Sequence, residues 1–259
     1  MFPVEPIAIW PEYLGCAIHH NWQNLNTSLL CQSKSSGLEA MNLTILRASA
    51  FGEYDYVFDK WFEMQEKYHN FKKTNTKPMC GYTSWYRHYE NISEDTIKND
   101  LAGVLTLSQK IDIFQIDDGY ETAVGDWLSI DEKKFPKGIK NLCDEIHSQN
   151  ILAGLWLAPF VCETKSEIFK NHKDWLRKDD NGNFVKCGSN WSGFYALDLY
   201  NPEVIKYLEK VFDTVLNQWG FDMVKLDFLY AADRVPTAEK TRGQQMCEAM
   251  DLLRRLCGN

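Results

Sequence analysis

The sequence predicts an α/β fold made of parallel βα units, about the first four units of a (β/α)₈ TIM barrel, preceded by a short β-rich segment. Short, continuous apolar segments alternate with amphipathic helical segments after Pro78, which is typical of strands buried on both faces. About four such units occupy residues 78–259, whereas a closed barrel needs eight. Polar and aromatic residues follow each predicted strand, at the end where active sites of such barrels are built.

The first 77 residues follow a different pattern. Apolar runs at 6–10, 14–19 and 42–46 are separated by turns that carry Ser, Asn and Gly, so residues 1–50 are predicted to be β-rich. Between 53 and 70 the apolar side chains recur at helical spacing. We therefore expect three parts: a β-rich segment over 1–50, a helical linker over 51–77, and the βα units over 78–259.

The elements of the repeating part can be placed in order. Strands are expected at 79–85, 111–116, 151–157 and 221–228, and helices at 93–110, 138–149, 202–219 and 237–256. Ser93 and Asn201 are the expected N-caps, and the second is followed by a proline suited to the first helical position. Between the third strand and the third helix, residues 158–200 are expected to form a long excursion with a hairpin around Asp180–Gly182.

Composition excludes several classes of function. The chain carries 28 Lys and Arg against 36 Asp and Glu, a net charge of −8 without a basic run, so we expect neither nucleic-acid nor membrane binding. The longest uncharged apolar stretch, 151–162, is too short to cross a bilayer. The N-terminus lacks the basic region of a signal peptide, which predicts a cytoplasmic protein. Eight scattered cysteines without metal-ligand spacing predict free thiols, and no metal or cofactor is expected.

Chemically capable residues lie at the carboxyl ends of all four strands. They are Trp85 and Tyr86 after the first strand, Asp117 and Asp118 after the second, Trp156 in the third, and Lys225 and Asp227 in the fourth. Lys225 and Asp227 are two apart on a strand and share an orientation, so we expect the ammonium to keep Asp227 ionised. Carboxylates beside tryptophan rings suit a glycosidase, whose transition state resembles an oxocarbenium ion.

Each of these features also has a simpler explanation. Asp117-Asp118-Gly119 could be an ordinary turn, and the tryptophans could be core residues. Asp227 is harder to explain in that way, because an acidic side chain in an apolar strand is costly without a partner or a role. The repetition of the same kind of residue after four strands favours a functional site.

Five segments resemble, in order, motifs of the α-galactosidases of glycoside hydrolase family 36. They are Phe114–Tyr120, Gly125–Trp127, Gly154–Phe160, Tyr195–Leu199 and Val224–Tyr230. The resemblance implies a retaining exo-glycosidase that removes terminal α-D-galactosyl residues from oligosaccharides of the melibiose and raffinose type. It also implies that residues 1–50 are the remnant of an N-terminal β-sandwich.

The resemblance also implies roles for individual residues. Asp227 becomes the nucleophile that carries a covalent galactosyl group. Asp117 and Asp118 bind the C4 and C6 hydroxyls of galactose. Trp85, Tyr86, Trp156, Trp191 and Lys225 complete the substrate-binding set. The family's general acid/base lies on a later strand and has no counterpart in this chain, although a retaining enzyme needs it at roughly 5 Å from the nucleophile.

Two further expectations concern partners. The substrate is a galactose-containing oligosaccharide. The strands at 79–85 and 221–228 each have an unpaired edge in a sheet of four, so residues 1–259 alone are expected to self-associate and to be inactive until the remaining strands are added.

Other functions stay open at this point. One set keeps the fold: an α-N-acetylgalactosaminidase, or a galactosyl transferase of the raffinose-synthase kind. A second is an enolase-like barrel in which Asp118, Asp227 and another acid hold Mg²⁺, although a lysine among the ligands is unusual for such a site. A third is a sugar-binding fragment without catalysis. Hydrolysis of an aryl α-galactoside, with and without EDTA, separates them.

Overall fold

A computed structural model of the chain describes residues 29–32, 38–41, 59, 62–63, 66–67, 78–237 and 239–258. It divides into two units, Met1–Lys77 and Pro78–Asn259. In the first unit, β1 (Leu29–Gln32) pairs antiparallel with β2 (Leu38–Met41). The apolar runs at 6–10, 14–19 and 42–46 lie outside the described residues. Of the expected helix over 53–70, the five described residues are helical.

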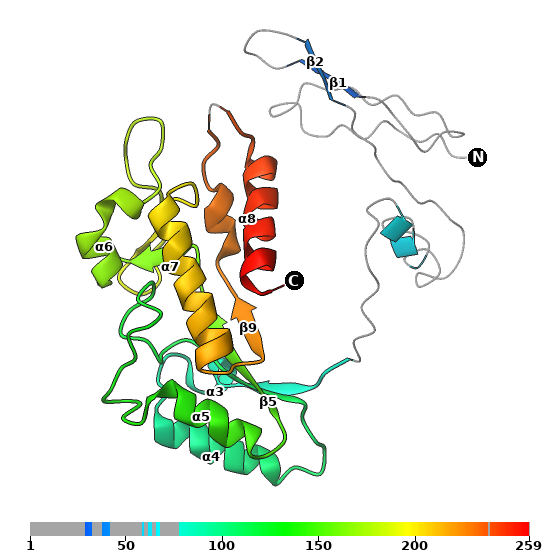
Figure 1. Ribbon diagram of the computed structural model, residues 1–259, viewed down its shortest axis with the longest axis vertical. Coiled ribbons are helices and arrows are strands. Elements are labelled where there is room, and N and C mark those ends of the chain that lie inside the picture. Colours follow the sequence, from blue (N-terminus) through cyan, green and yellow to red (C-terminus); the bar gives the residue numbers. More distant parts are fainter. Residues whose placement is uncertain are drawn as a thin grey trace. The chain divides into compact units, whose positions relative to one another are not determined.

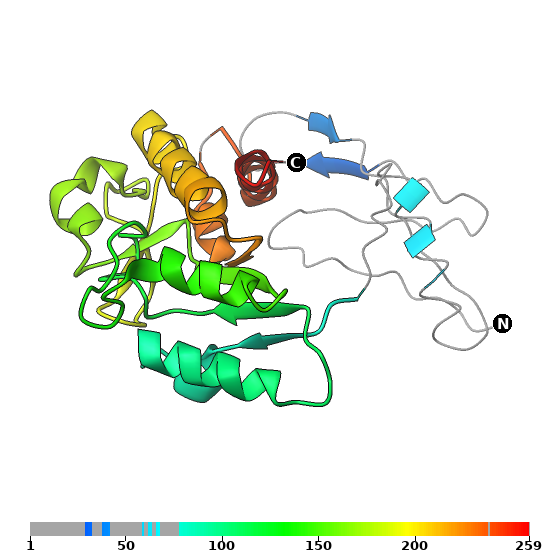
Figure 2. The same cartoon turned by 60° about the horizontal axis from the view of Figure 1, so that its bottom comes forward.

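The second unit contains the predicted parallel sheet (Figure 1). Its strands are β3 (Gly81–Thr83), β4 (Ile113–Ile116), β5 (Leu152–Leu157) and β9 (Met223–Leu226). They lie in the order β3-β4-β5-β9 and all neighbours are parallel, so each strand is placed beside the one before it (Figure 2). All four residues of β4 are buried, as expected for a strand covered on both faces. The α/β arrangement with four strands in sequential order is thus confirmed.

A helix follows each strand. These helices are α4 (Glu94–Leu105), α5 (Gly138–His147), α7 (Pro202–Phe212) and α8 (Arg242–Leu256). Both predicted N-caps are confirmed: the Ser93 hydroxyl accepts from Thr96 N, and the Asn201 side chain accepts from Glu203 N with Pro202 at the start of the helix. Helices α4 and α5 pack against each other, as do α7 and α8 (Figure 1).

Several boundaries differ from the prediction; for example, the helix expected over 93–110 ends at Leu105, and the strand expected over 221–228 covers Met223–Leu226. The first strand ends at Thr83, and Trp85 begins the short helix α3 (Trp85–His88). The helix expected to continue to Trp219 changes after Phe212 into a π-helical turn, η2 (Asp213–Gln218), in which Trp219 N bonds Thr214 O at 2.7 Å. The spacing of apolar residues does not indicate the end of the strand at Thr83 or the π-helical turn after Phe212, because it continues through both segments.

The last helix begins later than expected. Thr237 bonds Lys240 in a turn, and the helix starts at Arg242 with Thr241 as N-cap. Thr241 forms a reciprocal capping box with Gln244, an arrangement that satisfies two main-chain donors at once and explains why this threonine is used. The segment before it contains the 3₁₀ turn η3 (Leu229–Asp233).

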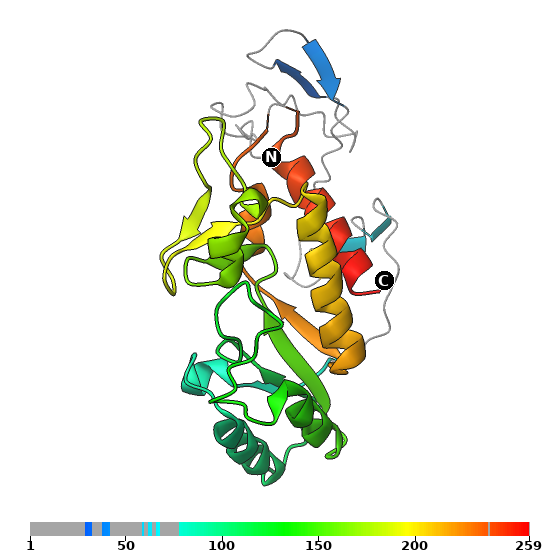
Figure 3. The same ribbon diagram turned by 60° about the vertical axis from the view of Figure 1, so that its left-hand side comes forward.

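The long excursion after β5 forms a small sheet of its own (Figure 3). Its antiparallel strands are β6 (Val161–Glu163), β7 (Lys186–Gly188) and β8 (Phe194–Ala196), in the order β6-β8-β7. The excursion also carries α6 (Glu167–Asn171) and η1 (Lys173–Trp175). The expected hairpin is confirmed by the antiparallel bridge between Lys178 and Phe184. The Tyr230 hydroxyl donates to Cys187 O at 2.9 Å, which ties this small sheet to the segment after β9.

One core unites the second unit. Its largest fully buried side chains include Trp127, Trp156, Tyr120, Phe114 and Phe160. Trp156 and Phe114 belong to the parallel sheet, whereas Trp127 and Phe160 belong to the segments that follow its strands. The core therefore extends beneath the carboxyl ends of the strands and gives the side chains there a rigid base. Among the described residues, no helix is both long and apolar enough to cross a membrane.

Candidate active site

Asp117 follows β4 and is almost completely buried, with 1% of its surface exposed. Its main-chain N–H donates to the Ser84 hydroxyl at 2.9 Å. Its Oδ2 accepts hydrogen bonds from Gln115 Nε2 at 2.8 Å and from Thr83 Oγ1 at 3.2 Å. The same oxygen forms an ion pair with Lys225 Nζ at 2.8 Å. Asp117 is therefore a fixed, charge-balanced anion.

The partner of Lys225 differs from the prediction. We expected its ammonium to pair with Asp227, two residues further along the strand, but the ion pair is with Asp117. Spacing along one strand indicates which residues share a face, and it does not indicate which charge lies across the sheet. A lysine side chain is long enough to reach a more buried carboxylate on another strand, and desolvation makes pairing there more valuable.

Asp227 is held by hydrogen bonds instead. Its Oδ2 accepts from the indole Nε1 of Trp156 at 3.2 Å, and its Oδ1 accepts from Phe228 N at 2.8 Å. The strand β9 ends at Leu226, and Phe228 adopts the left-handed conformation with φ +53°. This sharp turn directly after Asp227 leaves the aspartate half-buried at the end of the sheet.

Asp118 is buried but has a different environment from Asp117. It is 3% exposed, and its Oδ2 accepts from Trp191 Nε1 at 2.8 Å. Burial raises the pKa of Asp118 to about 6, although hydrogen bonds from Glu121 and Trp191 favour the ionised form. Gly119 follows with φ +113°, and a Cβ there would lie 2.4 Å from Glu90 O, so this position requires glycine.

Glu121 is a further member of this cluster, and we did not predict it from the sequence. It is 7% exposed and is hydrogen-bonded to Asp118. Burial, and then the charge of Asp118, raise the pKa of Glu121 well above its ordinary value. One feature of the sequence could have indicated it: Glu121 is an acidic residue directly after the motif Phe114–Tyr120 and close to the apolar pair Ala123-Val124.

Two tryptophans join the carboxylates. The rings of Trp156 and Trp191 lie 6.1 Å apart, and their N–H groups point to different aspartates, Asp227 and Asp118. Trp191 reaches this position from the small antiparallel sheet, with a left-handed backbone at φ +52°. The excursion after β5 therefore completes the cluster at the ends of the parallel strands.

Trp85 and Tyr86 lie on α3, which begins directly after Ser84, the residue whose hydroxyl accepts from Asp117 N. Trp85 is half-buried and packs its ring edge-on to Tyr89 at 5.2 Å, whereas Tyr86 is 82% exposed. Direct contacts join the other six predicted residues: Asp117, Asp118, Trp156, Trp191, Lys225 and Asp227. The proposed roles of all eight residues in substrate binding and catalysis stay predictions.

The cluster offers hydrogen-bond acceptors next to flat apolar rings. Asp118 and Asp227 can accept hydrogen bonds from hydroxyl groups, and the indole rings can stack on the face of a sugar ring. A half-buried carboxylate such as Asp227 can also act as a nucleophile. In the described part of the chain, no three His, Cys, Asp or Glu side chains are arranged to hold a metal ion.

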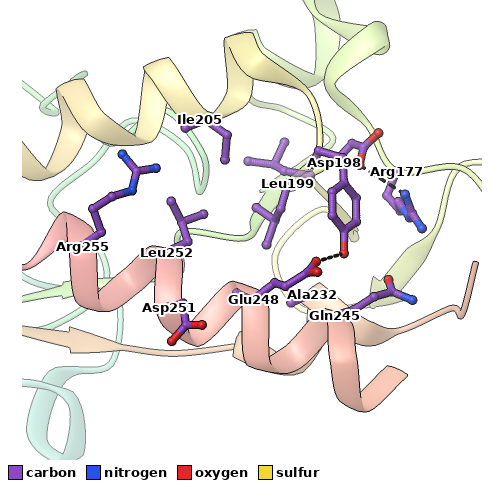
Figure 4. Close-up of a pocket in the computed structure, with 13 residues that line it drawn as sticks. Arg177, Asp198, Leu199, Ile205, Ala232, Gln245, Glu248, Asp251, Leu252 and Arg255 are labelled. Atoms are coloured by element: carbon purple, nitrogen blue, oxygen red, sulfur yellow. Dashed lines mark hydrogen bonds and ion pairs between the residues drawn. The ribbon is translucent and has the colours of Figure 1, made fainter. Parts of the chain in front are cut away.

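A separate cavity of about 360 Å³ lies between α7 and α8 (Figure 4). Its polar groups bind one another: Tyr200 donates to Glu248 Oε2 at 2.7 Å, and Arg177 Nη1 pairs with Asp198 Oδ1 at 3.2 Å. None of the predicted site residues lines this cavity. We therefore place the candidate active site at the strand ends.

Comparison with known proteins gives matches over most of the chain. Residues 56–253 match the family model described as Melibiase. The α-galactosidase of Escherichia coli is 25% identical over 272 residues, which cover 92% of this chain and 37% of that protein. The chain thus spans well under half the length of this relative.

Solved structures give the same result. The α-galactosidase TtGalA from Thermus thermophilus, in complex with stachyose, is 37% identical with a TM-score of 0.65, covering 73% of this chain and 40% of that one. The GH36 α-galactosidase AgaA from Geobacillus stearothermophilus is 20% identical with a TM-score of 0.58, covering 70% and 27%, a similarity that concerns the fold alone.

Proposed function

Because this chain belongs to the Melibiase family, we propose that the protein is an α-galactosidase that removes terminal α-D-galactosyl residues from oligosaccharides of the melibiose and raffinose type. The observation that carries the proposal is the contact cluster of Asp117, Asp118 and Asp227 with Trp156 and Trp191 at one end of the parallel sheet. We further propose that the four βα units are the first half of a (β/α)₈ barrel, in which this end is the active face.

The proposed reaction retains the configuration of the sugar. Asp227 attacks the anomeric carbon and forms a C–O bond, while the glycosidic C–O bond breaks and a general acid protonates the departing oxygen. Water then cleaves the galactosyl ester and gives up a proton to the group that acted as general acid, which now acts as general base. Asp227 returns as a carboxylate. The Trp156 N–H supports this assignment, because it orients Asp227 without neutralising it. We assign the general acid to none of the described residues.

Selection of galactose is assigned to Asp117 and Asp118. Galactose differs from glucose in its axial C4 hydroxyl, and buried carboxylates that accept from this hydroxyl and from the C6 hydroxyl are left unpaired by the wrong sugar. Asp118 suits this role best. Its side chain contacts Trp191 and Glu121 and, within the described part of the chain, is not neutralised by a lysine as Asp117 is, so its oxygens can still accept from a sugar hydroxyl. Lys225, which balances Asp117, is 36% exposed and can contact the ring hydroxyls as well.

The test is hydrolysis of an aryl α-galactoside by the full-length gene product. We expect turnover that EDTA does not reduce, and we expect Asp227→Asn to abolish it. A mechanism-based fluoro-galactoside should label Asp227 in the wild type. Asp251→Asn, on the exposed surface of α8, is the matched control and should keep full activity. Labelling of another residue contradicts the assignment of Asp227, and loss of activity with EDTA favours the Mg²⁺-dependent alternative.

A further inference from the structure

Glu121 is a buried carboxyl group to which the proposed mechanism gives no task. It is 7% exposed, and the ion pairs found among the described residues do not include it. Its backbone forms an antiparallel bridge with Ile130, and the neighbouring Thr122 N–H donates to Ser129 O at 2.8 Å. The direction of the Glu121 side chain is therefore set by a paired main chain.

Its side chain has two partners. Glu121 Oε2 accepts from Gly119 N at 3.4 Å, and a hydrogen bond joins the Glu121 carboxyl to that of Asp118. Asp118 receives a second hydrogen bond, from Trp191 Nε1, at its Oδ2. Glu121 and Trp191 thus hold the Asp118 carboxylate from two different parts of the chain.

The charges around the pair are mostly negative. Glu90 and Asp117 both disfavour ionisation of Asp118, and Asp117 is itself neutralised by Lys225. The ammonium group of Lys134 donates to the main-chain oxygens of Gly119 and Glu90 at 2.9 and 3.0 Å and is therefore engaged with the main chain. The buried Tyr120 hydroxyl donates to Trp156 O at 3.2 Å.

Two adjacent buried carboxyl groups without a cation do not both ionise readily, so such a pair retains one proton over a wide pH range. Burial raises the pKa of both groups. The Trp191 N–H donates to Asp118 Oδ2 at 2.8 Å and favours the anion on Asp118, whereas the bond from Gly119 N to Glu121 Oε2 is long, at 3.4 Å. Near neutral pH the retained proton therefore lies on Glu121, and Asp118 is the anion. Protons leave such a pair in two steps that belong to both groups together.

We propose that Glu121 is a positioning residue for sugar binding: its carboxylic acid O–H donates to the Asp118 carboxylate and fixes the oxygens that receive the galactose hydroxyls. This inference rests on the proposed function. Glu121 touches no substrate in this account and acts through Asp118. An amide at the same position can donate the same hydrogen bond but cannot lose its proton.

The experiment compares Glu121→Gln with Glu121→Ala in the full-length gene product. The inhibition constant of galactose is measured across the pH range in which each variant stays folded, together with kcat and KM for an aryl α-galactoside. Glu121→Ala should weaken galactose binding roughly tenfold, the effect of one lost charge-assisted hydrogen bond. Glu121→Gln should restore binding to within about threefold of the wild type near neutral pH.

The pH profile separates positioning from a merely structural role. In the wild type, galactose binding should weaken at alkaline pH as Glu121 loses its proton and repels Asp118. In Glu121→Gln this alkaline loss should disappear, whereas the loss at acid pH, which belongs to Asp118, should remain. Thermal unfolding of both variants identifies any effect of misfolding, and the isosteric Gln variant carries the test if the Ala variant does not fold.

Two results overturn the inference: a Gln variant that binds galactose as weakly as the Ala variant, or one that keeps the alkaline loss of the wild type. A wild-type protein that neither hydrolyses α-galactosides nor binds galactose overturns the proposed function itself. The two failures are therefore distinct, because the first leaves wild-type activity intact.

Discussion

Two buried carboxylates in the second unit, Asp100 and Asp118, are both 3% exposed and have opposite surroundings. Asp100, on α4, is saturated with donors: Arg87 Nη1 at 2.8 Å, His88 Nε2 at 2.6 Å and the Tyr82 hydroxyl. Its donors come from β3 and α3, so Asp100 joins three elements. Asp118 receives one indole N–H and is hydrogen-bonded to another acid, Glu121.

The difference teaches which buried acids serve the fold. A carboxylate that is buried with its own donors and cation stabilises the structure as long as all partners stay in place. A carboxylate buried without a cation reduces stability when it ionises, and it keeps acceptor capacity for a ligand. Asp117 lies between these cases, because Lys225 neutralises it while the ammonium stays 36% exposed. On this basis we expect Asp100 to be structural, and we propose that Asp118 serves binding.

The largest effect on stability is expected for Asp100→Ala. Removing the carboxylate leaves the Tyr82 hydroxyl and His88 without their acceptor, which should lower the free energy of unfolding by about 3 to 4 kcal/mol. Galactoside turnover should stay within about threefold of the wild type at temperatures where the variant is folded, a change of well under 1 kcal/mol in the activation barrier. Chemical denaturation and steady-state kinetics check both. A stable but inactive variant breaks the comparison.

The second effect concerns pH. The pKa of Asp118 is raised from an ordinary value of 3.8 to about 6 in the folded protein. The folded state therefore binds this proton more tightly, and the resulting stability is complete below about pH 4 and is lost as the pH rises through about 6. The loss amounts to roughly 3 kcal/mol, at 1.36 kcal/mol for each unit of pKa.

Asp118→Asn isolates this contribution. The free energy of unfolding of the wild type, minus that of the variant, should fall by that amount as the pH rises. A difference that stays constant with pH means that Asp118 is paired in the folded protein as Asp100 is.

Lys225→Met tests the intermediate case. The substitution leaves Asp117 buried without a cation, so we expect the free energy of unfolding to fall by about 2 kcal/mol, less than for a fully buried pair because the ammonium is partly exposed. Lys206→Met, on the exposed face of α7, is the matched control and should change stability by under about 0.5 kcal/mol. If both variants change the free energy of unfolding by the same amount, the ion pair between Lys225 and Asp117 does not stabilise the protein.

The smallest effect is expected for Tyr86→Ala. Tyr86 is 82% exposed, so its removal should alter stability by less than about 0.5 kcal/mol. Any role in substrate binding then appears as a change in KM without a change in unfolding. A loss of several kcal/mol in stability contradicts the exposed position of the Tyr86 side chain.

Regular elements of this fold are well encoded in local patterns. Continuous apolar runs placed the four parallel strands, and the side chains of Ser93 and Asn201 placed two helix starts, because both signals depend on neighbours in sequence. The start of the last helix was missed by a few residues, since Thr237 and Thr241 are both suitable caps and a reciprocal bond with Gln244 selects the second.

Contacts within the site were less predictable. The pairing of Lys225 with Asp117 depends on which strands are neighbours and how deeply each acid is buried, and spacing along the chain carries neither. Glu121 was missed because its significance arises from its contact with Asp118 in a buried turn. Trp191 was expected in the site through family resemblance alone, and its bond to Asp118 depends on how the excursion folds back.

The most direct test of the central claim is Asp118→Asn in the full-length gene product near neutral pH, with galactose affinity and the free energy of unfolding measured on the same preparation. We expect the two measured quantities to change in opposite ways. Affinity should fall at least tenfold, since a charged acceptor is lost at roughly 1.4 kcal/mol or more. The folded state should become no less stable, since a poorly neutralised buried charge is removed. A variant that binds galactose normally but unfolds more easily contradicts the account, because Asp118 is then a structural acid like Asp100.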